Sequence, residues 1–511
     1  MKAQTNRLTF SQQFFIATML FGLFFGAGNL IFPIFLGSQA GRNVWPAITG
    51  LLITGVGIPL LGVAAQGISR SNGLQEMAGR VSPRYSIFFT CALYLTIGPF
   101  FAIPRCASTS FTVGIEPLLG ENVNATVLLA AFSCVFFAAV LFFSLRPGKI
   151  LTWVGKLLTP LFLLVLAILV VTALLHPTDR IADVTPSAAY AAAPFFAGFL
   201  EGYNTMDALA SLAFGIVVIN VIRGLGVTEP GAIAKNTVLS GIFSCLFMGG
   251  IYVAVTIVGT RSHSLTVSCT NGGEAFAVIA EHYLGRAGLV VLALTVILAC
   301  LKTSIGLVTS CAETFTAMFP NGPKYGFWAI CFSIFSLLVT NIGLNAIIAI
   351  SLPVLMFLFP LAITLILLAL LGNLYGHDTV VYRWVTGFTL ADALFDFVKA
   401  LPKAITETPV VSAVIGFADS YLPFFELGLG WICPAAVGLF VGLIFHRTRR
   451  NRPAALSAAL SSWTLPVLPA CCLPDDCGRR SWHSVPSSRP RLHRESTYPS
   501  RSDRSAGGCR R

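Results

Sequence analysis

Glycines and polar residues interrupt the first long apolar stretch of the chain, where they could expose backbone groups to a ligand. Gly22, Gly26, Gly28, Asn29 and Pro33 lie close together, and the glycines and the proline each weaken a regular helix. Close packing of two helices through small residues also explains Gly22 and Gly26. Asn29 favours an unwound segment, because a lone amide within an apolar span is costly without partners.

A matching interruption lies in the sixth apolar stretch. Glu201, Tyr203, Asn204, Thr205 and Asp207 surround a glycine in the middle of this apolar run. Interruptions at corresponding places in two halves of a chain are the best sequence indication of a transporter site. Stretches one and six are the corresponding ones if two five-helix repeats of opposite orientation make up the fold.

The eighth apolar stretch carries two adjacent hydroxyl residues and a lysine. Thr303 and Ser304 could bind a small hard cation, which prefers oxygen ligands, or could bond back to carbonyls of their own helix. Lys302 would either extend to the interface or a water-filled vestibule, or place a fixed positive charge where a cation would otherwise bind.

Arg105 follows two prolines in the third apolar stretch and needs a carboxylate or carbonyl partner. Glu201, Asp207 and Glu313 are the candidates. The chain has no Gly-xxxx-Gly-Lys-Ser/Thr loop for ATP, and neither His-Glu-xx-His nor Gly-x-Ser-x-Gly. No spacing of cysteines indicates a disulfide or a zinc site, so no cofactor is expected.

The elements that position these residues are membrane-spanning helices. The 511 residues are 55% apolar and only 11% charged, which excludes a soluble globular protein, and the apolar runs lack the alternation of a β-barrel. Twelve spans are expected, at about 11–36, 44–68, 86–112, 124–144, 150–175, 189–219, 237–260, 286–312, 326–344, 346–371, 382–401 and 424–446. The eleventh contains several charged residues and could instead lie on the membrane surface.

The distribution of basic residues predicts the orientation. With the N-terminus inside, inner segments carry sixteen Lys and Arg and outer segments six, as the positive-inside rule requires. Twelve spans then place the C-terminus inside as well. The first apolar run has no small-residue cleavage site after it, so no removable signal peptide is expected.

Residues 447–511 differ in composition from the rest of the chain. They contain thirteen Arg against four acidic residues, which accounts for +9 of the net charge of +12. Low hydrophobicity with high charge predicts a disordered basic tail that could contact anionic lipid, rather than a nucleic-acid-binding module. Richness in Arg, Pro, Ser and Cys without Lys also suggests the hypothesis of a shifted reading frame.

Four segments resemble one known family. FFGAGNLIFPIFLGSQAG (24–41), GPFFAIPRCASTSF (98–111), FLEGYNTMDALASLAFG (199–215) and ACLKTSIGLVTSCAETF (299–315) resemble the bacterial branched-chain amino acid:cation symporters. The resemblance covers roughly residues 8–446. It implies an all-α polytopic fold of leucine-transporter type, with inverted repeats at about 8–175 and 189–371, helices 1 and 6 broken, and two further helices at 382–446.

The resemblance also implies where ligands bind. The amino acid would lie against the two breaks, and the sodium site of the wider fold would lie between helices one and eight. Carried onto this chain, the substrate residues are Gly26, Ala27, Gly28, Asn29, Phe199, Gly202, Tyr203 and Asn204. The cation residues are Gly22, Phe25, Cys300, Thr303 and Ser304. Arg105, Glu201, Asp207 and Lys302 are candidates for coupling or gating.

The expected function is uptake of leucine, isoleucine and valine with Na⁺ or H⁺ by alternating access, in a bacterial cytoplasmic membrane and without catalysis. Alternatives are a symporter of another small apolar amino acid, or a carrier impaired by an aberrant C-terminus. A channel would need a continuous polar stripe, and a sensor would need a folded output domain. The coupling ion and the oligomeric state stay open.

Overall fold

The computed structural model describes the backbone of residues 8–118, 124–145 and 150–461, and the side chains of these residues outside 150–162 and 450–461. Within these ranges the regular structure is helical, with no strand. The α-helices are α1 (Phe10–Phe24), α2 (Gly28–Ala40), α3 (Val44–Leu52), α4 (Ile58–Ile68), α5 (Leu74–Gly79), α6 (Pro83–Leu95), α7 (Ala102–Gly114), α8 (Ala125–Ser144), α9 (Ile150–Leu175), α10 (Ala188–Ala192), α11 (Pro194–Asn204), α12 (Asp207–Gly224), α13 (Pro230–Arg261), α14 (His263–Thr266), α15 (Gly272–Met318), α16 (Tyr325–Thr340), α17 (Leu344–Leu371), α18 (Thr379–Lys399), α19 (Lys403–Thr406), α20 (Pro409–Tyr421) and α21 (Ile432–Ser461).

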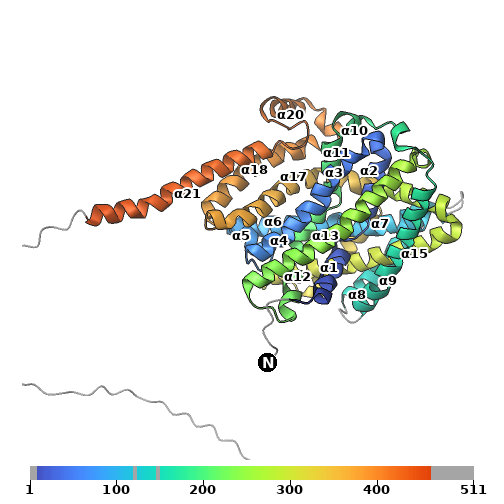
Figure 1. Cartoon of the computed structure of the whole chain (residues 1–511), viewed down its shortest axis with the longest axis horizontal. Coiled ribbons are helices and arrows are strands. Elements are labelled where there is room, and N and C mark those ends of the chain that lie inside the picture. The colour runs from blue at the N-terminus through green and yellow to red at the C-terminus, as the bar shows by residue number, and fades with distance from the viewer. Residues whose placement is uncertain (1–7, 119–123, 146–149, 462–511) are drawn as a thin grey trace, which may run out of the picture. The chain divides into compact units, whose positions relative to one another are not determined.

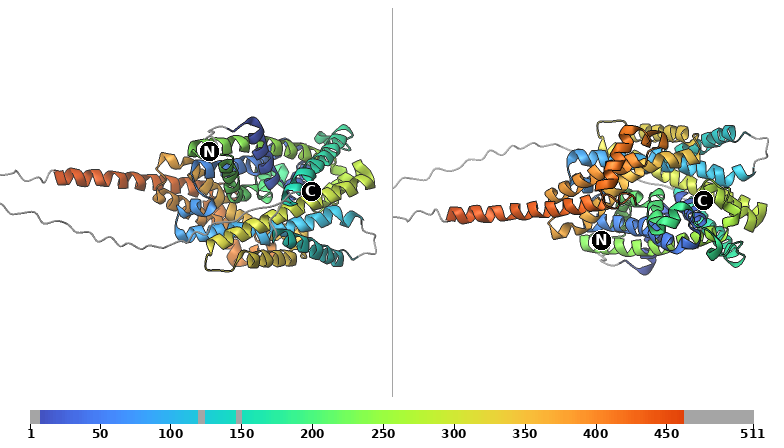
Figure 2. Two further views of the ribbon diagram at one scale, coloured as in Figure 1. Left: turned by 90° about the horizontal axis from the view of Figure 1, so that it is seen from below. Right: turned by 90° about the horizontal axis from the view of Figure 1, so that it is seen from above.

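Seven helical segments of the described chain are long and apolar enough to cross a membrane. They are Gly28–Ile68, Pro83–Leu118, Ala125–Ser144, Asp207–Gly224, Pro230–Arg261, Gly272–Met318 and Leu344–Leu374. The long helices run in roughly the same direction (Figure 2). α18 and α21 are not among the seven, so the count of twelve spans stays a prediction.

Both broken stretches pack against a helix of the other half of the chain. α1 and α2 pack against α13, and α11 and α12 pack against α3 and α4. Figure 1 shows α13 running alongside α2 and α4. α7 and α15, the third and eighth stretches, pack against each other. Each half of the chain therefore packs its broken stretch against a helix of the other half in the same way, as interlocked repeats require.

Glycines allow these helices to approach backbone to backbone. A Cβ atom on Gly37 of α2 would collide with the Thr256 carbonyl of α13, and one on Gly259 of α13 with the Ile34 carbonyl of α2. Gly50 of α3 and Gly198 of α11 make equivalent contacts between the other two helices. Small residues at helix crossings supply the van der Waals contact that stabilises helix pairs in lipid.

The last helix extends past its expected end. α21 continues to Ser461, whereas the sequence predicts disorder from residue 447. Arginines and alanines in this region favour helix, which explains the difference. Residues 1–454 group into one unit and residues 455–511 into a second. The rest of the predicted disordered tail, from 462 onward, lies outside the described residues.

Candidate substrate site

The first break lies between α1 and α2. α1 ends at Phe24, and Phe25 is extended, with φ −71° and ψ 101°. α2 begins at Gly28. The Asn29 side chain stabilises the unwound turn, because its Oδ1 accepts a hydrogen bond from the Gly26 N–H at 2.8 Å. Asn29, the polar residue that the sequence indicates at this break, therefore stabilises it.

The second break separates α11 from α12. α11 ends at Asn204, and Met206 has a left-handed backbone with φ 61° before α12 begins at Asp207. The interruption thus lies just after Gly202 rather than at it. Asp207 occupies the first turn of α12, where a negative charge interacts favourably with the helix dipole.

A buried hydrogen-bonded cluster joins the two breaks. Asn29 Nδ2 donates to Asp207 Oδ2 at 2.7 Å and to the Tyr252 hydroxyl at 2.6 Å, and that hydroxyl donates to the same carboxylate oxygen at 2.7 Å. All three side chains are at most 2% exposed. Tyr252, on α13, is a residue that the sequence analysis missed. Tyr252 is one of several polar residues in this helix, so its type and position alone did not single it out.

Arg105 of α7 joins the same two breaks from another side. Its Nη1 donates to the Asn204 carbonyl at 2.7 Å, and its guanidinium lies 5.0 Å from the centre of the Phe32 ring. A Cβ atom on Gly28 would lie only 2.9 Å from Arg105 Nη2, so glycine lets the guanidinium approach the start of α2. The partner of Arg105 is thus a carbonyl rather than any of the expected carboxylates.

These groups line a small cavity of about 40 Å³, enough for a few water molecules. Its polar wall includes Asn29, Arg105, Asp207 and Thr303, together with the Gly26–Gly28 backbone. Its apolar wall is formed by Leu23, Phe24, Ile97, Met206, Phe214 and Leu307, among others. Arg105 donates to the Asn204 carbonyl, and Asp207 accepts from Asn29 and Tyr252. The cavity is therefore lined by one basic and one acidic side chain, each with hydrogen-bond partners of its own.

The structure places only half of the predicted substrate residues at this cavity. Gly26, Ala27, Gly28 and Asn29 line it. The other four do not belong to its lining: the Phe199 carbonyl accepts a hydrogen bond from Thr54, Gly202 packs against Thr54, and Tyr203 stacks on Phe359 with ring centres 4.0 Å apart. Asn204 takes part only through its carbonyl, since its side chain donates to Glu201 at 3.3 Å.

The predicted cation residues lie where α15 approaches α1 and the first break, although each of the two close approaches there also involves a residue outside the predicted set. A Cβ atom on Gly22 would lie 3.1 Å from Lys302 Nζ, and one on Gly26 would lie 3.5 Å from Thr303 Cγ2. Thr303 donates to the Ala299 carbonyl of its own helix at 3.1 Å, and the buried Ser304 hydroxyl has no hydrogen-bond partner. The Lys302 ammonium therefore lies beside Gly22, one of the residues that the resemblance assigns to the sodium site, and the site itself stays a prediction.

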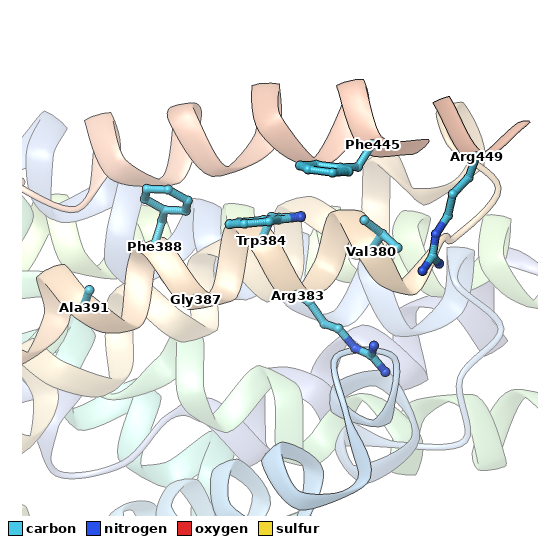
Figure 3. A pocket seen from close by; sticks show the side chains of 8 residues that line it. All are labelled: Val380, Arg383, Trp384, Gly387, Phe388, Ala391, Phe445 and Arg449. Carbon is cyan, nitrogen blue, oxygen red and sulfur yellow. The ribbon is translucent and has the colours of Figure 1, made fainter. Parts of the chain in front are cut away.

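A larger groove of about 630 Å³ lies between α18 and α21 (Figure 3). Its lining includes the stacked rings of Trp384 and Phe445, 5.5 Å apart, with Arg383 and Arg449 at one end. The lining contains no carboxylate. An amino acid needs an acceptor for its ammonium group, so the smaller cavity fits such a ligand better.

Comparison with known proteins identifies the family. A family model described as "Branched-chain amino acid transport protein" matches residues 10–449. The chain belongs to this family. Its members are membrane transporters and not enzymes. The match ends at residue 449.

The chain matches several curated relatives over nearly the whole length of each relative. The chain is 51% identical to "Branched-chain amino acid permease BrnQ" of Lactobacillus delbrueckii subsp. lactis over 84% of this chain and 96% of the relative. It is 40% identical to a permease of the same name from Bacillus subtilis (strain 168), over 86% and 98%. It is 36% identical to "Branched-chain amino acid transport system 2 carrier protein" of Pseudomonas aeruginosa, over 84% and 94%.

Solved structures of other transporters share the fold. Mhp1, a nucleobase-cation-symport-1 family transporter in a closed conformation, matches with a TM-score of 0.55 at 15% identity, over 86% of this chain and 93% of that one. A Na⁺-coupled sialic acid symporter matches with a TM-score of 0.53 at 14% identity, over 85% and 89%. The all-helical, leucine-transporter-like fold expected from the sequence is confirmed.

Proposed function

We propose that the chain imports leucine, isoleucine and valine by secondary active symport with Na⁺ or H⁺, using alternating access. The observation that carries this proposal is the cavity between the two helix breaks, in which Arg105 and Asp207 offer opposite charges beside an apolar wall. The names of the curated relatives support the substrate class.

A branched-chain amino acid is complementary to this cavity. Its carboxylate would lie between the Arg105 guanidinium and the first N–H groups of α2, where the helix dipole favours a negative charge. Its ammonium group would lie against Asp207, which can accept further hydrogen bonds. The aliphatic side chain would then contact Phe24, Phe214 and their neighbours. A channel is less consistent with these groups, which gather at one point instead of forming a polar stripe.

Alternating access fits the proposed inverted repeats at about 8–175 and 189–371. The reciprocal packing of each broken stretch on a helix of the other repeat supports this division. The cavity is small because helices close around it, so substrate entry requires them to move apart. We place the carrier in the bacterial cytoplasmic membrane with both ends of the carrier portion inside, as the basic residues of its loops indicate.

The purified chain in proteoliposomes should accumulate labelled leucine, and uptake should collapse when both the Na⁺ and the proton gradients are dissipated. Isoleucine and valine should compete with leucine, because one methylene changes binding by only about 1–3 kcal/mol. The measurement is initial uptake with Na⁺ and pH varied independently, and empty liposomes are the control. Uptake that persists without either gradient would reject symport, and absence of leucine uptake would reject the substrate.

A further inference from the structure

Two carboxylates are buried in α18, away from the candidate substrate cavity. Asp392 and Asp396 are 2% and 3% exposed and lie one helical turn apart, so their side chains share a face. Both oxygens of Asp392 and Oδ2 of Asp396 have no hydrogen-bond partner. Buried carboxylates without hydrogen-bond partners are costly when charged, so this pair indicates a site that binds a ligand or a proton.

Two buried donors beside the pair are also without hydrogen-bond partners. They are the Tyr203 hydroxyl and Trp431 Nε1, on residues that are 0% and 6% exposed. The Tyr203 hydroxyl lies near Trp431 and within electrostatic reach of Asp396. Gly430 brings the backbone close to the carboxylates, since a Cβ atom there would lie 3.1 Å from Asp392 Oδ1. The cluster is therefore an enclosed polar site.

The nearby cation is engaged elsewhere. Lys399 Nζ donates to the Phe425 carbonyl at 2.8 Å and lies 3.7 Å from Asp419 Oδ1 of α20. α17, which packs against α18, has no titratable residue between Leu344 and Leu371. Two buried carboxylates one turn apart are strongly destabilised if both are charged and no cation pairs with them.

The chemistry around the pair suits a proton better than a metal ion. A hard cation requires several oxygen ligands, whereas the other buried polar groups of this cluster are the Tyr203 hydroxyl and the Trp431 indole N–H, which are hydrogen-bond donors. Within the described residues, no cluster of three or more His, Cys, Asp or Glu side chains could hold a metal ion. The Lys302 ammonium beside Gly22 also disfavours Na⁺ at the site between α1 and α15.

We propose that Asp392 and Asp396 bind one dissociable proton between them and are the site where the carrier takes up its coupling proton from the outer side. This inference rests on the proposed function, namely symport of a branched-chain amino acid. In this step a hydronium ion of the external water gives up its proton, so that one of its O–H bonds breaks as one O–H bond forms on a carboxylate oxygen. The proton returns to water on the inner side when the carrier faces inward.

Tyr203 connects this acid pair to the candidate substrate cavity. It lies in α11, directly before Asn204, whose carbonyl accepts the hydrogen bond from Arg105 at 2.7 Å. Its ring is fixed against Phe359 of α17. A change in the charge of the pair therefore acts on the helix half that ends at the second break. Protonation of the pair can therefore affect the cavity through Tyr203 and the neighbouring Asn204.

The test measures proton entry and leucine movement separately in proteoliposomes that contain a pH-sensitive dye. External leucine should drive protons inward through the unmodified chain. In the double variant Asp392→Asn/Asp396→Asn, proton entry per leucine should fall roughly tenfold, within the usual range of coupling between two sites. Leucine exchange at equal pH should change by less than about twofold, because the substrate cavity is intact.

Glu426→Gln is the matched control, because Glu426 is an exposed carboxylate in the loop that contains Gly430 and Trp431. It should leave proton entry unchanged. If the double variant does not fold, the single variants Asp392→Asn and Asp396→Asn should each shift the pH profile of uptake, and an unshifted profile rejects the proposal. Proton entry at the unmodified level in the double variant, or uptake driven by Na⁺ alone, would also overturn it. Absence of leucine exchange in the unmodified chain would instead contradict the proposed function.

Discussion

Replacing Asp207 by Asn should lower leucine uptake by at least about thirtyfold, because removing one member of a buried, hydrogen-bonded charged group costs about 2–5 kcal/mol. The Asp207 carboxylate accepts hydrogen bonds from the Asn29 amide and the Tyr252 hydroxyl, each at 2.7 Å. It is also the proposed partner of the substrate ammonium. The measurement is initial uptake of labelled leucine by proteoliposomes with equal amounts of monodisperse protein.

Tyr252→Phe separates the role of Asp207 as a hydrogen-bond acceptor within the buried cluster from its proposed role as the partner of the substrate ammonium. This variant removes one hydrogen bond to the carboxylate but keeps its charge, and it should reduce uptake far less than Asp207→Asn. Unchanged kinetics in Asp207→Asn would show that the carboxylate does not face the substrate.

Replacing Arg105 by Lys should raise the KM for leucine, because an ammonium group cannot reproduce the planar guanidinium at the Asn204 carbonyl and above Phe32.

Replacing Gly259 by Leu should prevent stable assembly of the carrier. A Cβ atom at Gly259 collides with the backbone of Ile34 in α2, and backbone atoms in a packed helix cannot move aside cheaply. Overpacking of this kind costs about 1–3 kcal/mol or more, so little monodisperse protein should be recovered. Size-exclusion chromatography after detergent extraction measures the yield.

Gly250→Leu provides the control on the same helix. Gly250 also lies in α13, but no atom lies within 4 Å of the position that its Cβ would take. This variant should give the same yield as the unmodified chain, since it differs from Gly259→Leu only in what the side chain meets. Equal yields from both variants would contradict the close crossing of α2 and α13.

The sequence predicts the backbone of the candidate site better than its side-chain directions. The break beside Asn29 is visible in the sequence, because glycines and an isolated amide within an apolar run have a local physical meaning. Tyr203 and Asn204 are neighbours, yet Tyr203 stacks on Phe359 of α17 while the Asn204 carbonyl accepts from Arg105. The face that each residue of α11 presents is determined by packing against α3 and α17, which single-residue patterns do not encode.

Contacts between residues that are far apart in the chain could not be predicted from the sequence either. Tyr252 reaches Asp207 because α13 packs against α2 and α12, and Lys302 approaches Gly22 because α15 lies near the first break. Neither contact has a local signature. The end of the family portion was visible as a change in composition at residue 447, and α21 extends across that change to Ser461.

The central claim is that the amino acid lies in the cavity between the two helix breaks, and a single cysteine in its wall tests this most directly. Ala102 lines the cavity and is partly exposed. In a chain whose native cysteines are replaced, Ala102→Cys should react with a small maleimide, and saturating leucine should slow this reaction while aspartate should not. An alkylation rate that stays the same at saturating leucine, in protein that still transports it, would contradict this position of the substrate.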